Sequence, residues 1–268
     1  MKKIFKICQK NEVDKICRFI QSTFQKQKLS KVIIGLSGGI DSAVVLSLLA
    51  KALLPHNIYP IHLPYFKTDL KILNLLIKSL KIPANNFSVI NIKKPVDEIV
   101  NICHCEKKSD AVIIPSEVEG QSRIRLGNIM ARTRMIILFD QAKKLDALVC
   151  GTENKSEHLL GYFTRFGDAA SDIEPIQHLY KTQIYQLAKY LKIPREIINQ
   201  PPTAGLWNGQ TDEGQFRFTY KEADQVLSLY YDQRKSLKMI IKSGFPNVKI
   251  IIKMMRNNQF KNKTPYII

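Results

Sequence analysis

A glycine-rich turn between a short apolar segment and an apolar helix constrains the fold of this chain more than any other feature. Residues 32–36 are mostly apolar and β-branched, which predicts a buried parallel strand. A tight turn at 37–39 follows, and Asp41 and Ser42 begin an apolar helix that we expect to end near residue 54. Glycines let the backbone approach a ligand closely, and the free N–H groups and dipole of a helix start favour an anion. The sequence therefore predicts an anion-binding site at this turn.

The spacing of the glycines narrows the choice of anion. A Walker A loop needs a lysine directly after its second glycine, and none follows Gly39; the Gly-x-Gly-x-x-Gly dinucleotide pattern is also missing from this turn. The motif Ser37-Gly38-Gly39-Ile40-Asp41-Ser42 instead resembles the pyrophosphate loop of the N-type ATP pyrophosphatases, in which the loop holds the β- and γ-phosphates of ATP. The alternative is a strand–helix turn with a Ser or Asp cap that binds no ligand.

Apolar segments of strand length alternate with helical patterns along the first 150 residues. This alternation predicts an α/β fold with a doubly wound parallel sheet flanked by helices, with ligands at the carboxyl ends of the strands. We expect residues 1–268 to form a single domain. The predicted strands are 32–36, 58–63, 87–92 and 147–150. The predicted helices are 1–30 (amphipathic, packed across the sheet), 69–80, one from Pro95, 123–146, 180–191 and a helical tail; 103–122, 161–175 and 201–214 are predicted loops, the second of them mobile over a site.

Charge and cysteine usage limit the class of protein. Lys and Arg number 41 against 23 Asp and Glu, and the formal charge of +18 suits polyanionic ligands such as nucleotides or nucleic acid, although scattered lysines could equally be solvated. Five cysteines without framework spacing indicate a reducing, cytoplasmic compartment. Cys103-His104-Cys105 has no partner pair at zinc-ligand spacing. The sequence contains neither a signal-peptide core nor an apolar run of the ~18 residues that a membrane span needs.

Several further blocks accompany the loop, and together they resemble the ammonia-dependent NAD synthetases. The resemblance covers residues 35–261, about 85% of the chain. The blocks with the most specific patterns are Ala131-Arg-Thr-Arg-Met135 and Gly161-Tyr-Phe-Thr-Arg-Phe-Gly-Asp168. The others are His62-Leu-Pro-Tyr65, Gly151-Thr-Glu-Asn-Lys-Ser-Glu157, Lys181-Thr182 and Pro202-Thr203-Ala204.

The resemblance implies a role for each matched position. Asp41 and Glu157 would bind Mg²⁺, and Asp41 and Lys181 would be the catalytic residues. The ATP site would comprise Gly35, Leu36, Ser37, Gly38, Gly39, Ile40, Asp41, Ser42, Thr152, Lys181 and Thr203. Deamido-NAD would be held by Arg132, Arg165, Asp172, Phe260 and Lys261. Three positions depart from the family pattern: residue 165 is often Lys, residue 260 is often His, and Glu153 stands where Asp or Ser is common.

The same resemblance implies the reaction and the partners. The enzyme would be an AMP-forming ligase that amidates deamido-NAD with ammonia through an NAD-adenylate, releasing NAD, AMP and pyrophosphate in the last step of NAD biosynthesis. It implies a homodimer and neither nucleic acid nor membrane as a partner. Two alternatives stay open: a tRNA-modifying adenylating enzyme with the same loop, and a non-catalytic basic nucleic-acid-binding protein.

Free ammonia is the expected nitrogen donor, in place of glutamine. A glutaminase needs an activated cysteine nucleophile, usually in a domain of its own. The matched blocks leave only 34 residues before Gly35 and seven after Lys261. None of the five cysteines lies in a pattern typical of an activated nucleophile, so we expect ordinary thiols.

Overall fold

A four-stranded parallel sheet forms the centre of the molecule, as predicted. The computed structural model describes residues 5–103, 116–205, 207 and 209–263. The strand order is β3-β2-β1-β4, and the strands are β1 Lys31–Gly35, β2 Ile58–His62, β3 Ser88–Val89 and β4 Ala147–Cys150. β1 pairs in parallel with both β2 and β4. Because helices cover both faces of β1, Val32, Ile33 and Ile34 are all fully buried, which explains the uninterrupted apolar run.

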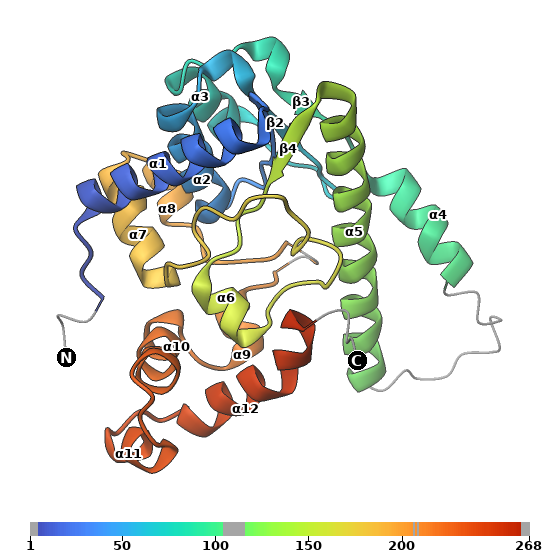
Figure 1. Cartoon of the computed structure of the whole chain (residues 1–268). Helices are drawn as coiled ribbons and strands as arrows, with labels where there is room; N and C mark the ends of the chain where they lie inside the picture. Colours follow the sequence, from blue (N-terminus) through green and yellow to red (C-terminus); the bar gives the residue numbers. More distant parts are fainter. Residues whose placement is uncertain (1–4, 104–115, 206, 208, 264–268) are drawn as a thin grey trace, which may run out of the picture.

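Helices cover both faces of the sheet, so the doubly wound arrangement is confirmed (Figure 1). On one face Val32 and Ile34 belong to a core shared with α1 Gln9–Gln27, α2 Ile40–Ala52, α3 Lys71–Ser79, α7 Lys181–Tyr190 and α8 Arg195–Ile198. On the other face Ile33 packs in a core with α4 Lys93–Cys103 and α5 Ser116–Leu145.

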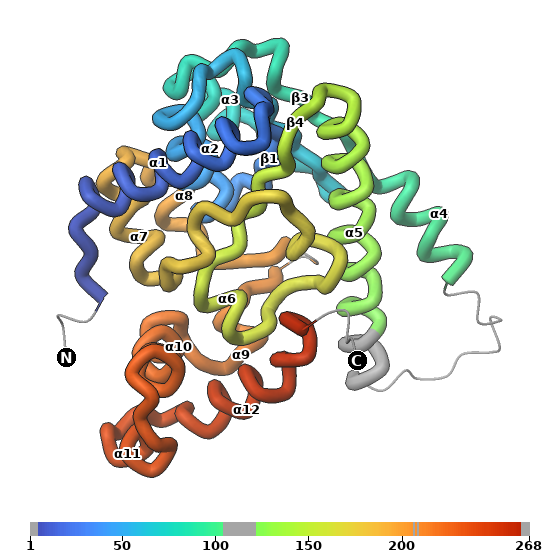
Figure 2. Tube along the Cα trace, viewed as in Figure 1, coloured from blue at the N-terminus to red at the C-terminus, as the bar shows by residue number. Residues whose placement is uncertain are grey.

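The second half of the chain adds a helical layer below the carboxyl ends of the strands (Figure 2). It has its own core, in which Leu160, Val226 and Ile251 are fully buried. Its elements are α6 Lys155–Leu160, α9 Asp212–Phe216, α10 Tyr220–Leu227, a π-helical turn at Ser228–Asp232, α11 Leu237–Lys242 and α12 Val248–Asn258. Single 3-10 turns lie at Pro55–Asn57, Ala84–Asn86 and Gln259–Asn262. The predicted helical tail is confirmed.

Four local predictions need correction. The loop predicted at 103–122 is wrong at its two ends, because Cys103 is the last residue of α4 and α5 already begins at Ser116; residues 104–115 lie outside the described part. The loop predicted at 201–214 ends early, since α9 begins at Asp212. The third strand is shorter than 87–92, although Ile90 and Ile92 still donate backbone hydrogen bonds to the carbonyls of His62 and Pro64. Helix α1 packs mainly on α2 and α7 instead of across the sheet.

None of the helices in the described ranges is long and apolar enough to cross a bilayer.

Candidate active site

The turn after β1 presents hydrogen-bond donors at the start of α2. Gly38 has a φ of 94°, a left-handed backbone conformation that residues other than glycine rarely adopt. The Ser37 hydroxyl accepts a hydrogen bond from the Gly39 amide at 3.2 Å and lies 3.1 Å from the Ser42 hydroxyl. The first turn of a helix leaves its N–H groups without intrahelical partners, and no side chain of the described residues caps α2. The loop therefore offers N–H groups and hydroxyls to an anion.

Three charged side chains meet beside this loop. The Lys181 Nζ atom lies 2.6 Å from the Asp41 Oδ2 atom and 3.1 Å from the Glu157 Oε1 atom. Asp41 comes from the first turn of α2, Glu157 from α6 and Lys181 from the first turn of α7. The Lys181 side chain is only 3% exposed, so both ion pairs are shielded from solvent. Residues far apart in sequence thus form one cluster, which we call the Lys181 cluster (Asp41, Glu157, Lys181).

Burial and mutual attraction set the charge state of the cluster. Burial is the main reason that the pKa of Glu157 rises to about 8; the Asp41 charge raises it further, and Lys181 opposes the rise. Burial alone would lower the pKa of Lys181, but the Asp41 and Glu157 carboxylates raise it well above its ordinary value. The lysine therefore stays charged between the two carboxyl groups, and its charge limits the rise in the pKa of Glu157.

A buried aspartate fixes the backbone around Lys181. Asp224 on α10 accepts hydrogen bonds from the Thr182 amide at 2.9 Å and the Thr182 hydroxyl at 2.7 Å. Its other oxygen accepts a hydrogen bond from the Ser156 hydroxyl, which in turn accepts one from the Lys181 amide at 2.9 Å. Helices α6, α7 and α10 are thereby joined at the point where Lys181 enters the site.

The donor set of the cluster fits a hard divalent cation only in part. The Asp41 and Glu157 carboxylates already converge on one cation, the Lys181 ammonium, and carboxylate oxygens are ligands that Mg²⁺ prefers. No group of three or more His, Cys, Asp or Glu side chains that could hold a metal occurs among the described residues. Phosphate oxygens and water would have to complete an octahedral shell.

Four of the five residues predicted to hold deamido-NAD gather around the segment 161–168. The Arg132 guanidinium donates to the Arg165 carbonyl at 3.3 Å. The Arg165 guanidinium lies over the Phe260 ring, 5.6 Å from its centroid. The Lys261 ammonium donates to the carbonyls of Gly161 and Phe163 at 2.8 and 3.1 Å. Sequence positions 132, 165, 260 and 261 therefore meet in space.

Asp172, Thr152 and Thr203 are the remaining predicted residues. Asp172 accepts a hydrogen bond from the Val149 amide at 2.8 Å, so one carboxylate oxygen is engaged with β4. Thr203 accepts a hydrogen bond from the Gly205 amide at 3.0 Å, within its own turn. Thr152 lies in the segment between β4 and α6. Neither threonine hydrogen-bonds to the Lys181 cluster in the part of the chain that the structure describes.

Two residues of the site were missed by the sequence reasoning. Asn154 donates to the Asp41 Oδ1 atom at 3.1 Å and caps α6 in a capping box with Glu157. The spacing Asn154-x-x-Glu157 is the sequence signature of such a box and could have revealed it. No local sequence pattern indicates the role of Asp224, because its hydrogen-bond partner Thr182 is 42 residues away in the sequence.

The comparison with known proteins decides the family. A family model described as NAD synthase matches residues 12–265. The chain belongs to the NAD synthase family. Its members include an NH(3)-dependent NAD(+) synthetase of Fusobacterium nucleatum, which is 41% identical over 259 residues that span 95% of this chain and 93% of that protein. A synthetase of the same name from Thermococcus sibiricus is 38% identical over 94% of both chains.

Solved structures of the family have the same fold. An NH3-dependent NAD synthetase of Campylobacter jejuni, in complex with nitrate, has a TM-score of 0.75 and 30% identity and covers 98% of this chain and all of that one. An NMN synthetase of Francisella tularensis has a TM-score of 0.80 and 29% identity, covering 98% of this chain and 99% of its own.

Proposed function

We propose that this protein is an ammonia-dependent NAD synthetase, in which residues 1–268 form one domain that amidates deamido-NAD with ammonia and converts ATP to AMP and pyrophosphate. The observation that carries the proposal is the Lys181 cluster beside the glycine-rich loop, in a chain 41% identical to a synthetase of that name. An inert nucleic-acid-binding protein has no use for two half-buried carboxyl groups that converge on one buried cation.

The ATP phosphates are assigned to the loop and its neighbours. The loop donors of residues 35–42 would hold the β- and γ-phosphates, and the Lys181 ammonium would bind the leaving pyrophosphate. Thr152, which follows β4, and Thr203, in the segment between α8 and α9, are assigned to ATP as well. Asp41 and Glu157 would hold Mg²⁺, whose chemistry is to neutralise charge on the leaving group when it is bound.

Deamido-NAD is assigned to the group around segment 161–168. The Arg132 and Arg165 guanidinium groups are planar donors that suit the phosphates and carboxylate of this dinucleotide. Phe260 offers a ring beside Arg165, and Lys261 fixes the 161–163 backbone. Asp172 keeps one carboxylate oxygen for the substrate, because the other accepts from Val149.

The chemistry that this arrangement supplies is positioning and charge neutralisation. A nicotinate carboxylate does not react with ammonia until it is activated. Its oxygen attacks the α-phosphate of ATP, which gives an acyl-adenylate and releases pyrophosphate. Ammonia then replaces AMP on the acyl carbon. No side chain has to become a covalent nucleophile, but water has to be kept from the adenylate.

The direct test is incubation of purified protein with MgATP, deamido-NAD and ammonium chloride. We expect NAD and AMP in equal amounts. A parallel reaction with glutamine in ammonia-free buffer should give little NAD. Absence of AMP-coupled NAD formation would refute the proposal, and efficient use of low-millimolar glutamine would refute the choice of nitrogen donor.

A second candidate, NMN synthesis, is favoured by one observation. The NMN synthetase structure has a higher TM-score than the NAD synthetase structure, 0.80 against 0.75. Relatives that are 41%, 38% and 36% identical to this chain are named NH(3)-dependent NAD(+) synthetases, which favours the dinucleotide. Nicotinate mononucleotide supplied in place of deamido-NAD distinguishes the two functions. Turnover at micromolar nicotinate mononucleotide would support NMN synthesis, and turnover only with micromolar deamido-NAD would support NAD synthesis.

Homodimerisation and a cytoplasmic location complete the proposal. The family resemblance supports the homodimer, and the absence of a framework spacing among the cysteines supports a reducing compartment.

A further inference from the structure

Arg134 belongs to the block at residues 131–135 but is assigned neither to ATP nor to deamido-NAD. Arg132 of the same block is exposed, whereas Arg134 is partly buried, and its Nε atom donates a hydrogen bond to the Leu63 carbonyl at 3.0 Å. Leu63 directly follows β2, an inner strand of the sheet. The guanidinium is therefore held at the carboxyl end of this strand, the edge at which ligands of open α/β sheets bind.

The Arg134 guanidinium has no paired anion. It forms no ion pair within the ranges that the structure describes, and its bond to Leu63 uses only one of its N–H groups. Burial lowers the pKa of Arg134, and the charge of Asp168 opposes this shift. Burial also raises the pKa of Asp168, whose carboxyl group already accepts a hydrogen bond from the Thr164 amide at 2.9 Å. Because arginine stays protonated in proteins and an unpaired buried cation is costly, this group indicates an anionic ligand.

Arg134 lies on α5 between contacts with the two assigned substrate sites. Ala131, Arg134 and Leu138 are three and four residues apart, so they share one face of the helix. A Cβ atom added at Gly35, where the segment assigned to ATP begins, would lie 3.3 Å from the Leu138 Cδ1 atom. A Cβ atom added at Gly167, in the segment assigned to deamido-NAD, would lie 3.1 Å from the Ala131 Cβ atom. The guanidinium therefore originates between these two segments.

The two reacting groups have to meet between the same two segments. Adenylate formation brings the nicotinate carboxylate of deamido-NAD into contact with the α-phosphate of ATP. Both groups are anions, so they repel each other as they approach. A planar guanidinium can bind two phosphate oxygens at once and offset their charge. The position and the charge of Arg134 thus suit this encounter.

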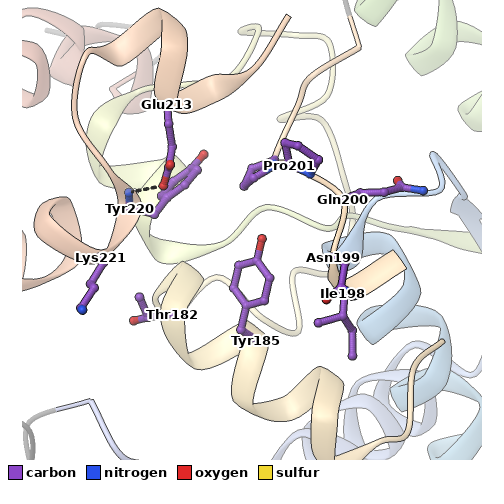
Figure 3. Close-up of a pocket in the computed structure, with 10 residues that line it drawn as sticks. Thr182, Tyr185, Ile198, Asn199, Gln200, Pro201, Glu213, Tyr220 and Lys221 are labelled. Carbon is purple, nitrogen blue, oxygen red and sulfur yellow. Dashed lines mark hydrogen bonds between the residues drawn. The ribbon is translucent and has the colours of Figure 1, made fainter. Parts of the chain in front are cut away.

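A separate cavity of about 440 Å³ lies between α7, the segment after α8 and the starts of α9 and α10 (Figure 3). None of its lining residues belongs to α5 or β2, so Arg134 does not line it. The lining includes the Glu213 carboxylate, and Figure 3 shows the Lys221 side chain directed away from the Tyr185 hydroxyl. These features disfavour an anion in the cavity, whereas Arg134 has no paired carboxylate in the described chain.

We propose that the Arg134 guanidinium binds the α-phosphate of ATP at the point where the deamido-NAD carboxylate attacks it. The inference rests on the proposed function, since that function supplies both reactants. A carboxylate oxygen forms a bond to the α-phosphorus while the bond from this phosphorus to the pyrophosphate oxygen breaks, and pyrophosphate leaves with the bonding electron pair. The terminal amino groups of Arg134 donate hydrogen bonds to the non-bridging α-phosphate oxygens, and the arginine transfers no proton.

The test compares steady-state turnover with adenylate formation in Arg134→Gln, which removes the charged planar donor. We expect kcat to fall about 100-fold, with much smaller changes in both KM values, because charge on the α-phosphate oxygens grows in the transition state. Single-turnover adenylate formation from labelled ATP, measured by acid quench without ammonia, should slow by a similar factor. Arg134→Lys keeps the charge without the planar pair of donors, so its rate should lie between those of the wild-type protein and Arg134→Gln.

Arg125→Gln is the matched control. Arg125 lies on the same helix about 14 Å before Arg134 and also donates to a backbone carbonyl, that of Cys103 at 3.2 Å, but it is exposed. Its adenylation rate should stay at the wild-type value. Circular dichroism of each variant shows whether the fold is kept.

Adenylation at the wild-type rate in Arg134→Gln would overturn the inference, as would a loss confined to KM for deamido-NAD, which would group Arg134 with Arg132. If Arg134→Gln does not fold, Arg134→Lys decides: adenylation at the wild-type rate would overturn the inference, and slower adenylation by a folded protein would support it. These results refute the role of Arg134 alone when the wild-type protein makes NAD. Failure of NAD synthesis in the wild-type protein would instead refute the proposed function.

Discussion

The two carboxylates of the Lys181 cluster should be indispensable for turnover. Asp41→Asn and Glu157→Gln keep the shape of each side chain and remove one charged oxygen ligand, so we expect activity at moderate Mg²⁺ to fall roughly 100-fold or more. Circular dichroism should show an unchanged fold. Asp69→Asn is a suitable control, since Asp69 is exposed and lies before α3. A variant that keeps more than a few per cent of wild-type activity would contradict the metal assignment.

Arg132 should matter for the dinucleotide and little for ATP. It lies on α5 and contacts the Arg165 carbonyl, on the side of the site assigned to deamido-NAD. For Arg132→Ala we expect KM for deamido-NAD to rise about tenfold or more, because a guanidinium–anion contact is lost, while KM for ATP changes less than twofold. Arg123→Ala, on the same helix, serves as the comparison. Equal losses for both substrates would show that Arg132 acts on the site as a whole.

Glu174 should make stability depend on pH. Burial is the main cause that raises its pKa from 4.5 to about 8, and the charges of Glu153 and Asp168 raise it further; hydrogen bonds from the Ser171 hydroxyl and the Glu153 amide oppose the rise. Because the folded pKa lies above the unfolded one, the unfolded state loses its proton first. The stability contributed by protonated Glu174 is therefore complete below about pH 4.5 and is lost as the pH rises to about 8.

The glutamine of Glu174→Gln does not titrate. As the pH rises from 5 to 8, the unfolding free energy of the wild-type protein should therefore fall relative to that of the variant. One unit of pKa shift corresponds to about 1.4 kcal/mol, so a change of about 2 kcal/mol or more is expected. Denaturant titration at several pH values measures it, with exposed Glu196→Gln as the control. A difference that stays constant over this range would show that Glu174 is already ionised in the folded protein.

At the scale of elements, Asn154 both caps helix α6 and contacts the active-site residue Asp41. The Asn154 Oδ1 atom caps the helix by accepting from the Glu157 amide at 3.1 Å, and its Nδ2 atom donates to Asp41. Asn154→Ala removes both, so we expect a loss of about 1 kcal/mol in the free energy of unfolding and a loss of activity. Asn154→Ser keeps a cap but not the donor to Asp41. It should regain part of the stability and none of the activity; recovery of both would separate Asn154 from the site.

The elements that the sequence predicted well are those whose signal is local. β1, its glycine turn and α2 follow from an apolar run, two adjacent glycines and a helix start within about twenty residues. The start of α5 was missed because Pro115 and Gly120 indicated a loop. Proline at the start of a helix is favourable, however, and each of the two interior glycines, Gly120 and Gly127, costs only about 1 kcal/mol in a helix of 30 residues.

The parts of the site that the sequence did not predict depend on long-range contacts. Asp224 supports Lys181 through Thr182 and Ser156, and no spacing in the sequence links these three positions. The gathering of Arg132, Arg165 and Lys261 around segment 161–168 followed only from the family resemblance.

At the scale of the whole molecule we expect a homodimer of about 61 kDa, twice the chain mass of 30.7 kDa. Helices α4 and α5 expose large apolar side chains at Ile102, Ile124 and Ile136, which are 76%, 47% and 59% exposed. Burial of such side chains at a twofold axis would stabilise the pair. Ile136→Lys should shift the protein toward monomer in sedimentation velocity at micromolar concentration. A wild-type protein that sediments as a monomer there would contradict this expectation.

The ion pairs of Lys181 have a consequence for the protein before any nucleotide arrives. The ammonium group is a built-in counter-ion, so the carboxylates do not need a dissolved cation to tolerate each other in the folded state. We therefore expect the melting temperature to be insensitive to chelators, whereas turnover should stop when they are added if Asp41 and Glu157 hold Mg²⁺ as proposed. On that proposal, newly made chains would fold in a cell depleted of magnesium and would regain turnover when the ion returns.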